Sequence, residues 1–225
     1  MSESAFAQRW GFAPKSALLT RALTHRSAAP HPHSNERLEF LGDALLNLYV
    51  ARLLMDALPD AAEGTLTLAR ASVVDRETQA DAAQALGLPE LLRIDTGGQK
   101  MGIAQQTRLL SGAYEALVGA LYQESGERVA LAFVEATLAE SLQAAIQNPT
   151  TKHPKSLLQE ALQGQGRRKP EYRARAMQSD TVMVEVLCES LVLGTGTGHA
   201  LRAAEKVAAL DALAHLTDLP PGSML

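Results

Sequence analysis

The chain has 225 residues, of which 46% are hydrophobic and 20% charged, with a net charge of −4 at pH 7. It contains no uninterrupted apolar stretch of about 18 residues and no cleavable apolar segment at its start, which argues against a membrane protein and predicts a soluble, cytoplasmic one. The single cysteine, Cys188, excludes an intramolecular disulfide and is expected to be a plain core thiol.

Apolar residues recur three and four apart through the first two thirds of the chain, which indicates amphipathic helices separated by Pro, Gly and Asn. We expect these helices over residues 5–10, 15–23, 35–57, 65–71, 75–86, 107–124 and 127–146. Residues 145–154 then hold two prolines in a polar run, which predicts a linker.

The pattern changes after this linker. A short helical stretch precedes three segments that alternate like strands, and a further helix closes the chain; they occupy residues 156–164, 171–178, 181–189, 191–198 and 200–216. We therefore expect an all-α N-terminal domain followed by a small α+β domain of order α-β-β-β-α. The expected divisions are residues 1–147 for the first domain, 148–152 for the linker, 153–218 for the second domain and 219–225 for a tail.

Charge is distributed unevenly between the two parts. Residues 1–150 carry 12 Lys and Arg against 17 Asp and Glu, whereas residues 151–225 carry 9 against 8. Within the second part, residues 167–175 hold several basic side chains and one acid. Because a phosphate backbone responds to a local basic patch, the acidic average does not exclude a nucleic-acid partner.

Three carboxylates interrupt a helix that otherwise reads as buried. Glu36, Glu39 and Asp43 fall within about 60° of one another around the helix. Like charges at this spacing repel, so a positive partner must face them. One interpretation is a structural ion-pair cluster with Arg26 or Arg37. The other is a hard cation such as Mg²⁺, which prefers oxygen ligands.

A fourth acid lies alone in another apolar helix. Glu115 is the only charged residue within 109–122, and an ionised group in an apolar setting needs a partner. We therefore expect Glu115 to meet the first group of carboxylates.

Several segments resemble the ribonuclease III family. The stretch NERLEFLGDALL (35–46) is similar, without a gap, to the signature helix of that family, and ALTHRSA, EGTLTLARASVV and YEALVGALY follow in the family's order and spacing. The later segments HPKSLLQEALQG, PEY and GTGTGHALRAAEKVAALDAL resemble the double-stranded-RNA-binding domain of bacterial members. The resemblance covers nearly the whole chain.

This resemblance implies a Mg²⁺-dependent endoribonuclease, with Mn²⁺ able to substitute, that cleaves double-stranded RNA to 5′-phosphate and 3′-hydroxyl ends. It implies that Glu39, Asp43 and Glu115 bind the metal and that Asp43 and Glu115 are catalytic. Glu36 and Glu63 fall at further acidic positions of the same valley.

A homodimer is also implied, because a twofold dimer presents one acid cluster to each strand of a duplex. Phe40, beside the acids, resembles the family's dimer-contact residue, although on sequence alone it reads equally well as ordinary core. The expected partners are therefore double-stranded RNA and a second copy of the chain, with no membrane.

One position departs from the family pattern A-D-x-x-E-A. This chain has S-G-A-Y-E-A, so Gly112 stands where an acid is expected. Ser111 points about 100° away around the helix and is a poor substitute. Because Mg²⁺ commonly retains water ligands, a water could take the vacated position. We therefore expect an attenuated enzyme with a raised metal requirement.

The second domain departs as well. Family members usually carry two or three Lys or Arg at the start of the last helix, where this chain has His199 and Arg202, with Lys206 one turn later. Weaker phosphate binding is expected at this helix. A basic group outside it is expected to offset the loss, namely Arg167, Arg168 and Lys169.

Two polar residues of the preceding short helix complete the expected RNA contacts. Gln159 and Glu160 match positions that reach the RNA minor groove and its 2′-hydroxyls. Without the resemblance, they read as ordinary surface residues.

The function that the sequence favours is cleavage of duplex RNA in the processing of ribosomal and messenger RNA precursors and in RNA decay. The main rival is a catalytically weakened dimer that binds double-stranded RNA without efficient cleavage. A purely structural helical protein with ion-pair clusters is a third alternative.

Overall fold

The computed structural model of the chain describes residues 2–149, 153–178 and 181–216. The chain divides into two compact units between residues 151 and 152, and each unit is described by itself. Of the divisions expected from the sequence, residues 150–152 of the linker, residues 217 and 218 of the second domain and the tail at 219–225 lie outside the described residues.

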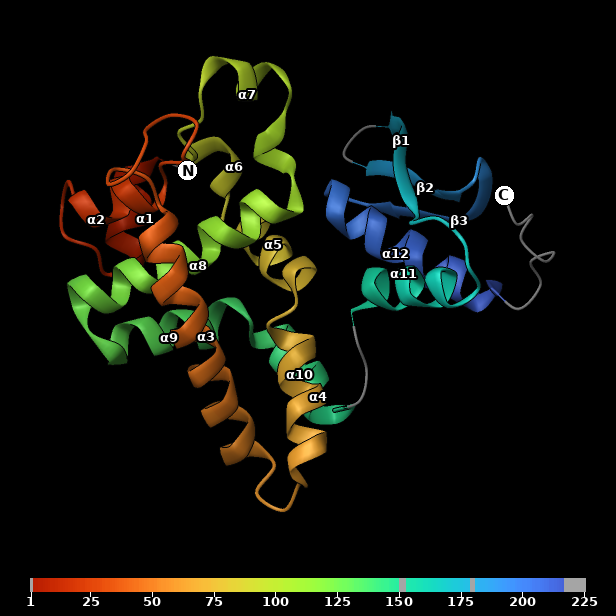
Figure 1. The fold of residues 1–225 in the computed structure, drawn as a ribbon, viewed down its shortest axis with the longest axis horizontal. Helices are drawn as coiled ribbons and strands as arrows, with labels where there is room; N and C mark the ends of the chain where they lie inside the picture. Colours follow the sequence, from red (N-terminus) through yellow and green to blue (C-terminus); the bar gives the residue numbers. More distant parts are fainter. Residues whose placement is uncertain (1, 150–152, 179–180, 217–225) are drawn as a thin grey trace. The chain divides into compact units, whose positions relative to one another are not determined.

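The described part of the first unit is helical (Figure 1). Its long helices are α3 (Glu36–Ala57) and α8 (Thr107–Ser125), and shorter helices surround them. The shorter α-helices are α1 (Glu3–Trp10), α2 (Ala17–Ala22), α4 (Glu63–Val73), α5 (Arg76–Ala85), α6 (Leu88–Leu91), α7 (Thr96–Lys100), α9 (Glu127–Thr137) and α10 (Ala139–Gln147), with a 3-10 turn η1 at Ile103–Gln105.

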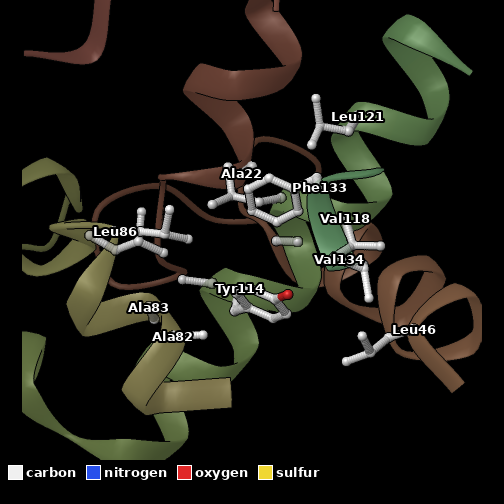
Figure 2. Packing of buried hydrophobic residues seen from close by; sticks show 14 of the residues in the cluster. Ala22, Leu46, Ala82, Ala83, Leu86, Tyr114, Val118, Leu121, Phe133 and Val134 are labelled. Carbon is white, nitrogen blue, oxygen red and sulfur yellow. The ribbon is translucent and has the colours of Figure 1, made fainter. Parts of the chain in front are cut away.

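Helix α8 lies at the centre of this unit and packs against α2, α3, α5 and α9. Most of its residues between Leu109 and Leu121 are buried, which accounts for its nearly unbroken apolar sequence. Tyr114 stacks against Phe133 of α9 with ring centroids 5.6 Å apart (Figure 2). The Tyr114 hydroxyl and the Thr137 hydroxyl are hydrogen-bonded at 2.7 Å, so the polar end of this core side chain is satisfied.

Two glycines let α3 and α8 touch backbone to backbone where they cross. A Cβ added to Gly42 would lie 1.7 Å from the carbonyl oxygen of Glu115, and one added to Gly119 would lie 2.4 Å from the carbonyl oxygen of Leu38. Helices that pack through side chains keep their axes about 8–10 Å apart. Gly42 and Gly119 therefore permit a closer approach than any other residue type would allow.

Two features of the first unit differ from the sequence-based expectation. Residues 127–146, expected as one helix, form α9 and α10, with a 70° bend between them. The short helices α6 and α7 and the turn η1 were not expected, because three to five residues are too few to show a helical period. Helix α7 depends instead on its cap, since Asp95 Oδ1 accepts from the Gly98 amide at 2.9 Å.

The second unit consists of a three-stranded sheet and two helices. The antiparallel strands follow the order β1-β2-β3, and Cys188 is buried at the end of β2. The elements are α11 (Pro154–Gly164), β1 (Glu171–Gln178), β2 (Thr181–Cys188), β3 (Leu191–Gly198) and α12 (Leu201–Ala214). Together with the helical first unit, this confirms the expected fold class.

The GTGTG stretch of β3 is a packing surface for α12. A Cβ on Gly194 would lie 2.5 Å from the amide nitrogen of Ala212, and one on Gly196 would lie 2.3 Å from the carbonyl oxygen of Ala204. Gly198 is also in close contact with the start of α12. Because glycines alternate along the strand, all three lie on the face that α12 covers.

No single described helix is long and apolar enough to cross a membrane. Helices α9 and α10 reach the required length and composition only as a pair, with the 70° bend between them.

We predict that Gly42→Ala destabilises the first unit by about 3 kcal/mol or more, because the new methyl group meets backbone that cannot rotate away. Urea unfolding followed by the fluorescence of Trp10, the single tryptophan, measures this loss. Gly64→Ala is the matched control, because a Cβ there meets nothing within 4 Å and alanine favours the helix by up to about 1 kcal/mol. An unchanged urea midpoint for Gly42→Ala would contradict the backbone contact.

Candidate active site

Helix α3 presents three acids to one side of the first unit. Glu36 is exposed and is held by neighbours on its N-terminal side, since the Ser34 hydroxyl donates to it at 3.1 Å and Arg26 lies 3.7 Å away. Glu39 is half-buried. Asp43 is exposed, and its Oδ1 accepts a hydrogen bond from the Asn47 side-chain amide at 3.1 Å.

Helix α8 brings Glu115 to the same place. Its neighbour Tyr114 points into the core, and successive side chains diverge by about 100° around a helix, so Glu115 leaves the core on another side. The carbonyl oxygen of Glu115 lies against Gly42, which stands next to Asp43 in α3. The glycine contact between the helices thus sets where the acids meet.

The acids line a cleft of about 720 Å³ together with several cationic and polar side chains. Such a combination suits a substrate that is itself anionic and is bound with a cation. The charged and polar side chains that line the cleft are His25, Arg26, Asn35, Glu36, Glu39, Asp43, Arg76, Gln79, Gln106, Arg108, Ser111 and Glu115.

Gly112, one turn before Glu115, also lines the cleft, and the Glu39 carboxylate rests against it. A Cβ on Gly112 would lie 2.9 Å from the carboxylate carbon of Glu39 and 2.9 and 3.1 Å from its two oxygens. Glu39 therefore occupies space that any side chain at position 112 would claim. Because the crowded atoms are the far end of a flexible side chain, Glu39 can move aside.

The cleft disfavours negative charge on its buried acids. Burial and the nearby charges of Asp43 and Glu39 raise the pKa of Glu115 to about 7, against opposing effects of Gln79 and Arg76. Burial and the charge of Glu36 raise the pKa of Glu39, although Arg108, Arg26 and Arg76 oppose this rise. A bound cation would relieve both carboxylates.

The donor set fits a hard cation that keeps water ligands. The three acids Glu39, Asp43 and Glu115 offer carboxylate oxygens from two helices to one cleft. Within the described part of the chain, no three Asp, Glu, His or Cys side chains stand ready as a metal-binding group. These carboxylates would therefore share the ion with several water ligands, as is usual for Mg²⁺.

The ion-pair alternative applies to Glu36 alone. Arg26 pairs with Glu36, whereas among the described residues no arginine lies within ion-pair distance of Glu39, Asp43 or Glu115. The pair with Glu36 is exposed and contributes little to stability.

Several polar and charged residues that line the cleft were not among the expected site residues, including His25, Arg76, Gln79 and Arg108. His25 Nδ1 accepts from the Ser27 amide at 3.2 Å. Arg76 and Arg108 stand in the first turns of α5 and α8. Charged residues are common near helix ends, so no sequence signal marked them.

Of the two remaining expected residues of this unit, Phe40 lines the cleft and Glu63 does not. Glu63 begins α4, accepts from the Thr67 hydroxyl at 2.9 Å and is not among the described residues that line the cleft. Phe40 is 82% exposed, so its alternative interpretation as ordinary core is wrong.

The expected RNA contacts in the second unit divide into exposed and buried side chains. His199, Lys206 and Glu160 are exposed and Gln159 is partly exposed. Arg202, in the first turn of α12, is only 7% exposed.

The basic stretch at 167–175 is largely paired within its own unit. Arg167 is 9% exposed and lies 3.8 Å from Glu189, and Arg173 and Arg175 form ion pairs with Glu171 and Glu185. Arg168 and Lys169 are exposed. The expected patch is therefore narrower than the sequence indicates.

Comparisons with known proteins agree for both units. Residues 15–142 match the family model described as ribonuclease-III-like, and residues 154–216 match the double-stranded RNA binding motif. Ribonuclease 3 of Thiobacillus denitrificans is 43% identical over 208 residues, covering 90% of this chain and 91% of the relative. Ribonuclease 3 of Symbiobacterium thermophilum is 39% identical over 204 residues, covering 88% and 86%.

A solved structure resembles the first unit. The nuclease domain of ribonuclease III from Campylobacter jejuni superposes with a TM-score of 0.59 at 32% sequence identity, covering 62% of this chain and 98% of that one. The work on that domain concerns flexibility in a region involved in dimer formation.

We predict that Glu115→Gln stabilises the metal-free protein increasingly as pH rises from about 5 to 8. The pKa of Glu115 in the folded state, about 7, lies above its ordinary value of 4.5, so its stabilising proton is fully bound below pH 4.5 and is lost as pH rises through 7. After discounting for partial exposure, the gain should reach about 2 kcal/mol. Urea unfolding in a chelator at several pH values measures it, and a difference that does not vary with pH would contradict the shift.

Proposed function

The chain belongs to the ribonuclease III family, and from that premise we propose that it cleaves double-stranded RNA with Mg²⁺, leaving 5′-phosphate and 3′-hydroxyl ends. The family and the double-stranded RNA binding motif support an endoribonuclease of double-stranded RNA. The observation that carries the finer proposal is the cleft in which acids of α3 and α8 meet. Mg²⁺ is the proposed ion, with Mn²⁺ able to replace it.

The proposed roles divide the cleft into metal-binding and supporting residues. Glu39, Asp43 and Glu115 hold the ion, and Asp43 and Glu115 are the catalytic acids. When bound, the ion activates water and screens the scissile phosphate. Asn47 holds the Asp43 carboxylate by its hydrogen bond. Glu36 and Glu63 are assigned accessory acidic roles.

Arginines of the cleft supply charge for the RNA backbone in this proposal. Arg76 and Arg108 line the cleft with the acids, and guanidinium groups bind phosphate oxygens in a bidentate manner. The cationic side chains thus orient the strand while the acids hold the ion. Binding of this kind depends on phosphate spacing and not on base sequence.

The second unit is proposed to add affinity for the duplex. A-form RNA exposes its minor groove and 2′-hydroxyls, so recognition by shape suits residues on two helices of one small domain. We assign contacts to Gln159 and Glu160 of α11 and, near the start of α12, to His199 and Lys206. Arg202 is only 7% exposed and is not assigned a direct contact. Arg168 and Lys169 offer exposed charge, whereas Arg167 is assigned mainly to its pairing with Glu189.

A homodimer is proposed to form along α3. Phe40, Leu48 and Met55 are 82%, 51% and 60% exposed, and large exposed apolar side chains on one helix are typical of an interaction surface. A twofold pair would present two clefts to the two strands of a duplex. In the cell we place this activity in the cytoplasm, in the maturation of ribosomal and messenger RNA precursors and in RNA decay.

We predict that the protein cleaves a long perfect RNA duplex but not the matching single strand, and only when Mg²⁺ or Mn²⁺ is added. Asp43→Asn should lower the rate by about two orders of magnitude, because it removes charge that acts in the transition state. Denaturing gels measure cleavage and native gels measure binding. A shift of the duplex without cleavage at any metal concentration would favour the rival function, a dimer that only binds RNA.

We also predict that Gly112→Asp lowers the Mg²⁺ concentration for half-maximal cleavage by about tenfold, the effect typical of one supporting contact to a metal site. The new side chain displaces the Glu39 carboxylate and adds an oxygen donor beside Glu115. Gly112→Asn is the matched control, because it has the same size without the charge. Equal metal dependence in wild type and Gly112→Asp would end the idea that this position limits the enzyme.

A further inference from the structure

Gln79 is a buried amide at the edge of the proposed metal site. It lies in α5, is 2% exposed and has alanines around it in the sequence, at positions 80, 82 and 83. It also lines the cleft with the acids. A buried amide costs free energy unless its polar atoms find partners, so its position in an apolar helix face calls for a physical reason.

The nitrogen of this amide joins two elements. Gln79 Nε2 donates to the carbonyl oxygen of Val74 at 2.8 Å, and the Gln79 side chain lines the cleft with Glu115 and acts to lower the pKa of that carboxyl. Only a donor stabilises the charged form of a carboxyl, so the amide nitrogen is the end of Gln79 that faces Glu115. Exchanging the amide oxygen and nitrogen would set oxygen against oxygen at Val74, which fixes the orientation of the side chain.

The oxygen of the same amide can still accept a hydrogen bond. Gln79 Oε1 is buried and has no hydrogen-bond partner among the described residues. A buried acceptor without a donor costs about 1–3 kcal/mol. It is bonded to the same carbon as Nε2 and so lies close to the carboxylate that Nε2 faces.

We propose that Gln79 is a positioning residue of the acid cleft: its Nε2 clamps the Glu115 carboxylate to the Val74 end of α4, and its Oε1 accepts from a water ligand of the bound cation. This inference rests on the proposed function, since it concerns the same ion. It also fits the absence of an acid side chain at Gly112, which leaves Glu115 without a charged neighbour one turn earlier on α8. Support for Glu115 comes instead from α5.

The test compares two glutamines of the same helix that each have a buried Oε1. Gln79→Met removes both polar atoms at similar volume, and Gln84→Met does the same at a residue whose Oε1 also has no partner among the described residues but which does not line the cleft. Electron paramagnetic resonance measures Mn²⁺ affinity of the full chain without RNA. We expect Gln79→Met to weaken Mn²⁺ binding 10- to 100-fold, the usual effect of removing a supporting contact, and Gln84→Met to leave it unchanged.

Thermal unfolding in a chelator separates positioning from folding. A merely structural role would lower the melting temperature of Gln79→Met without changing its Mn²⁺ affinity, and that result would overturn the proposal, as would equal affinities in both variants. Gln79→Leu, which also lacks both polar atoms, replaces the methionine variant if that one does not fold. A wild-type protein that binds no Mn²⁺ would instead refute the proposed function.

Discussion

The contact between the backbones of α3 and α8 is the constraint on which the site depends. Gly42 and Gly119 lie so close to the opposite helix that a single methyl group at either would collide with a carbonyl oxygen. Glycine in a helix costs about 1 kcal/mol relative to alanine, so the sequence gives up intrinsic helix stability twice to obtain this approach. In return, Asp43, beside Gly42, is brought next to Glu115. Two apolar helices can thereby present acids to one cleft while their other faces remain in the core.

The electrostatic cost of that arrangement is visible in the cleft itself. Burial and like charges disfavour the ionised form of Glu115, and hydrophobic packing offers nothing in compensation at that side chain. The nearby groups that oppose the effect are polar, namely the Gln79 amide and the guanidinium of Arg76. Carboxyl groups whose ionised form is disfavoured by burial and by one another reduce stability, which is typical of residues that serve a chemical function. The arginines also distinguish this cleft from a simple acidic pocket, because they suit an anionic substrate.

The periodicity of the sequence was sufficient to predict the long helices and the order of the second unit. α3 and α8 begin and end within a residue of their expected bounds, because long amphipathic segments carry a strong signal. Convergence of Glu115 with the acids of α3 was also expected, on the ground that a lone charge in an apolar helix needs a partner. The structure places all of them in one cleft. The burial of Arg167 and Arg202 could not be predicted, because a basic residue in a sequence does not reveal whether the fold covers it.

Gln79 and Gly42 are two further residues whose roles could not be predicted from the sequence. A glutamine in a helix is normally predicted to be exposed, and a glycine in a helix is normally predicted to destabilise it. Only the packing of the helices shows that Gln79 lines the cleft beside Glu115 and that Gly42 sets how closely α3 approaches α8. The position of the bend between α9 and α10 could not be predicted from the sequence either, since tertiary contacts and not the local pattern decide where a helix ends.

The row of glycines in β3 has a consequence for how the second unit can change over time. Main-chain atoms of α12 lie against Gly194 and Gly196 of β3, whereas the side chain of Lys206 on the same helix is exposed. Substitutions at those outward positions can alter attraction for a polyanion while leaving the interior undisturbed. The affinity of this unit for a polyanion can therefore change by substitution without loss of folding stability. A chain with few basic residues on α12 can still fold stably.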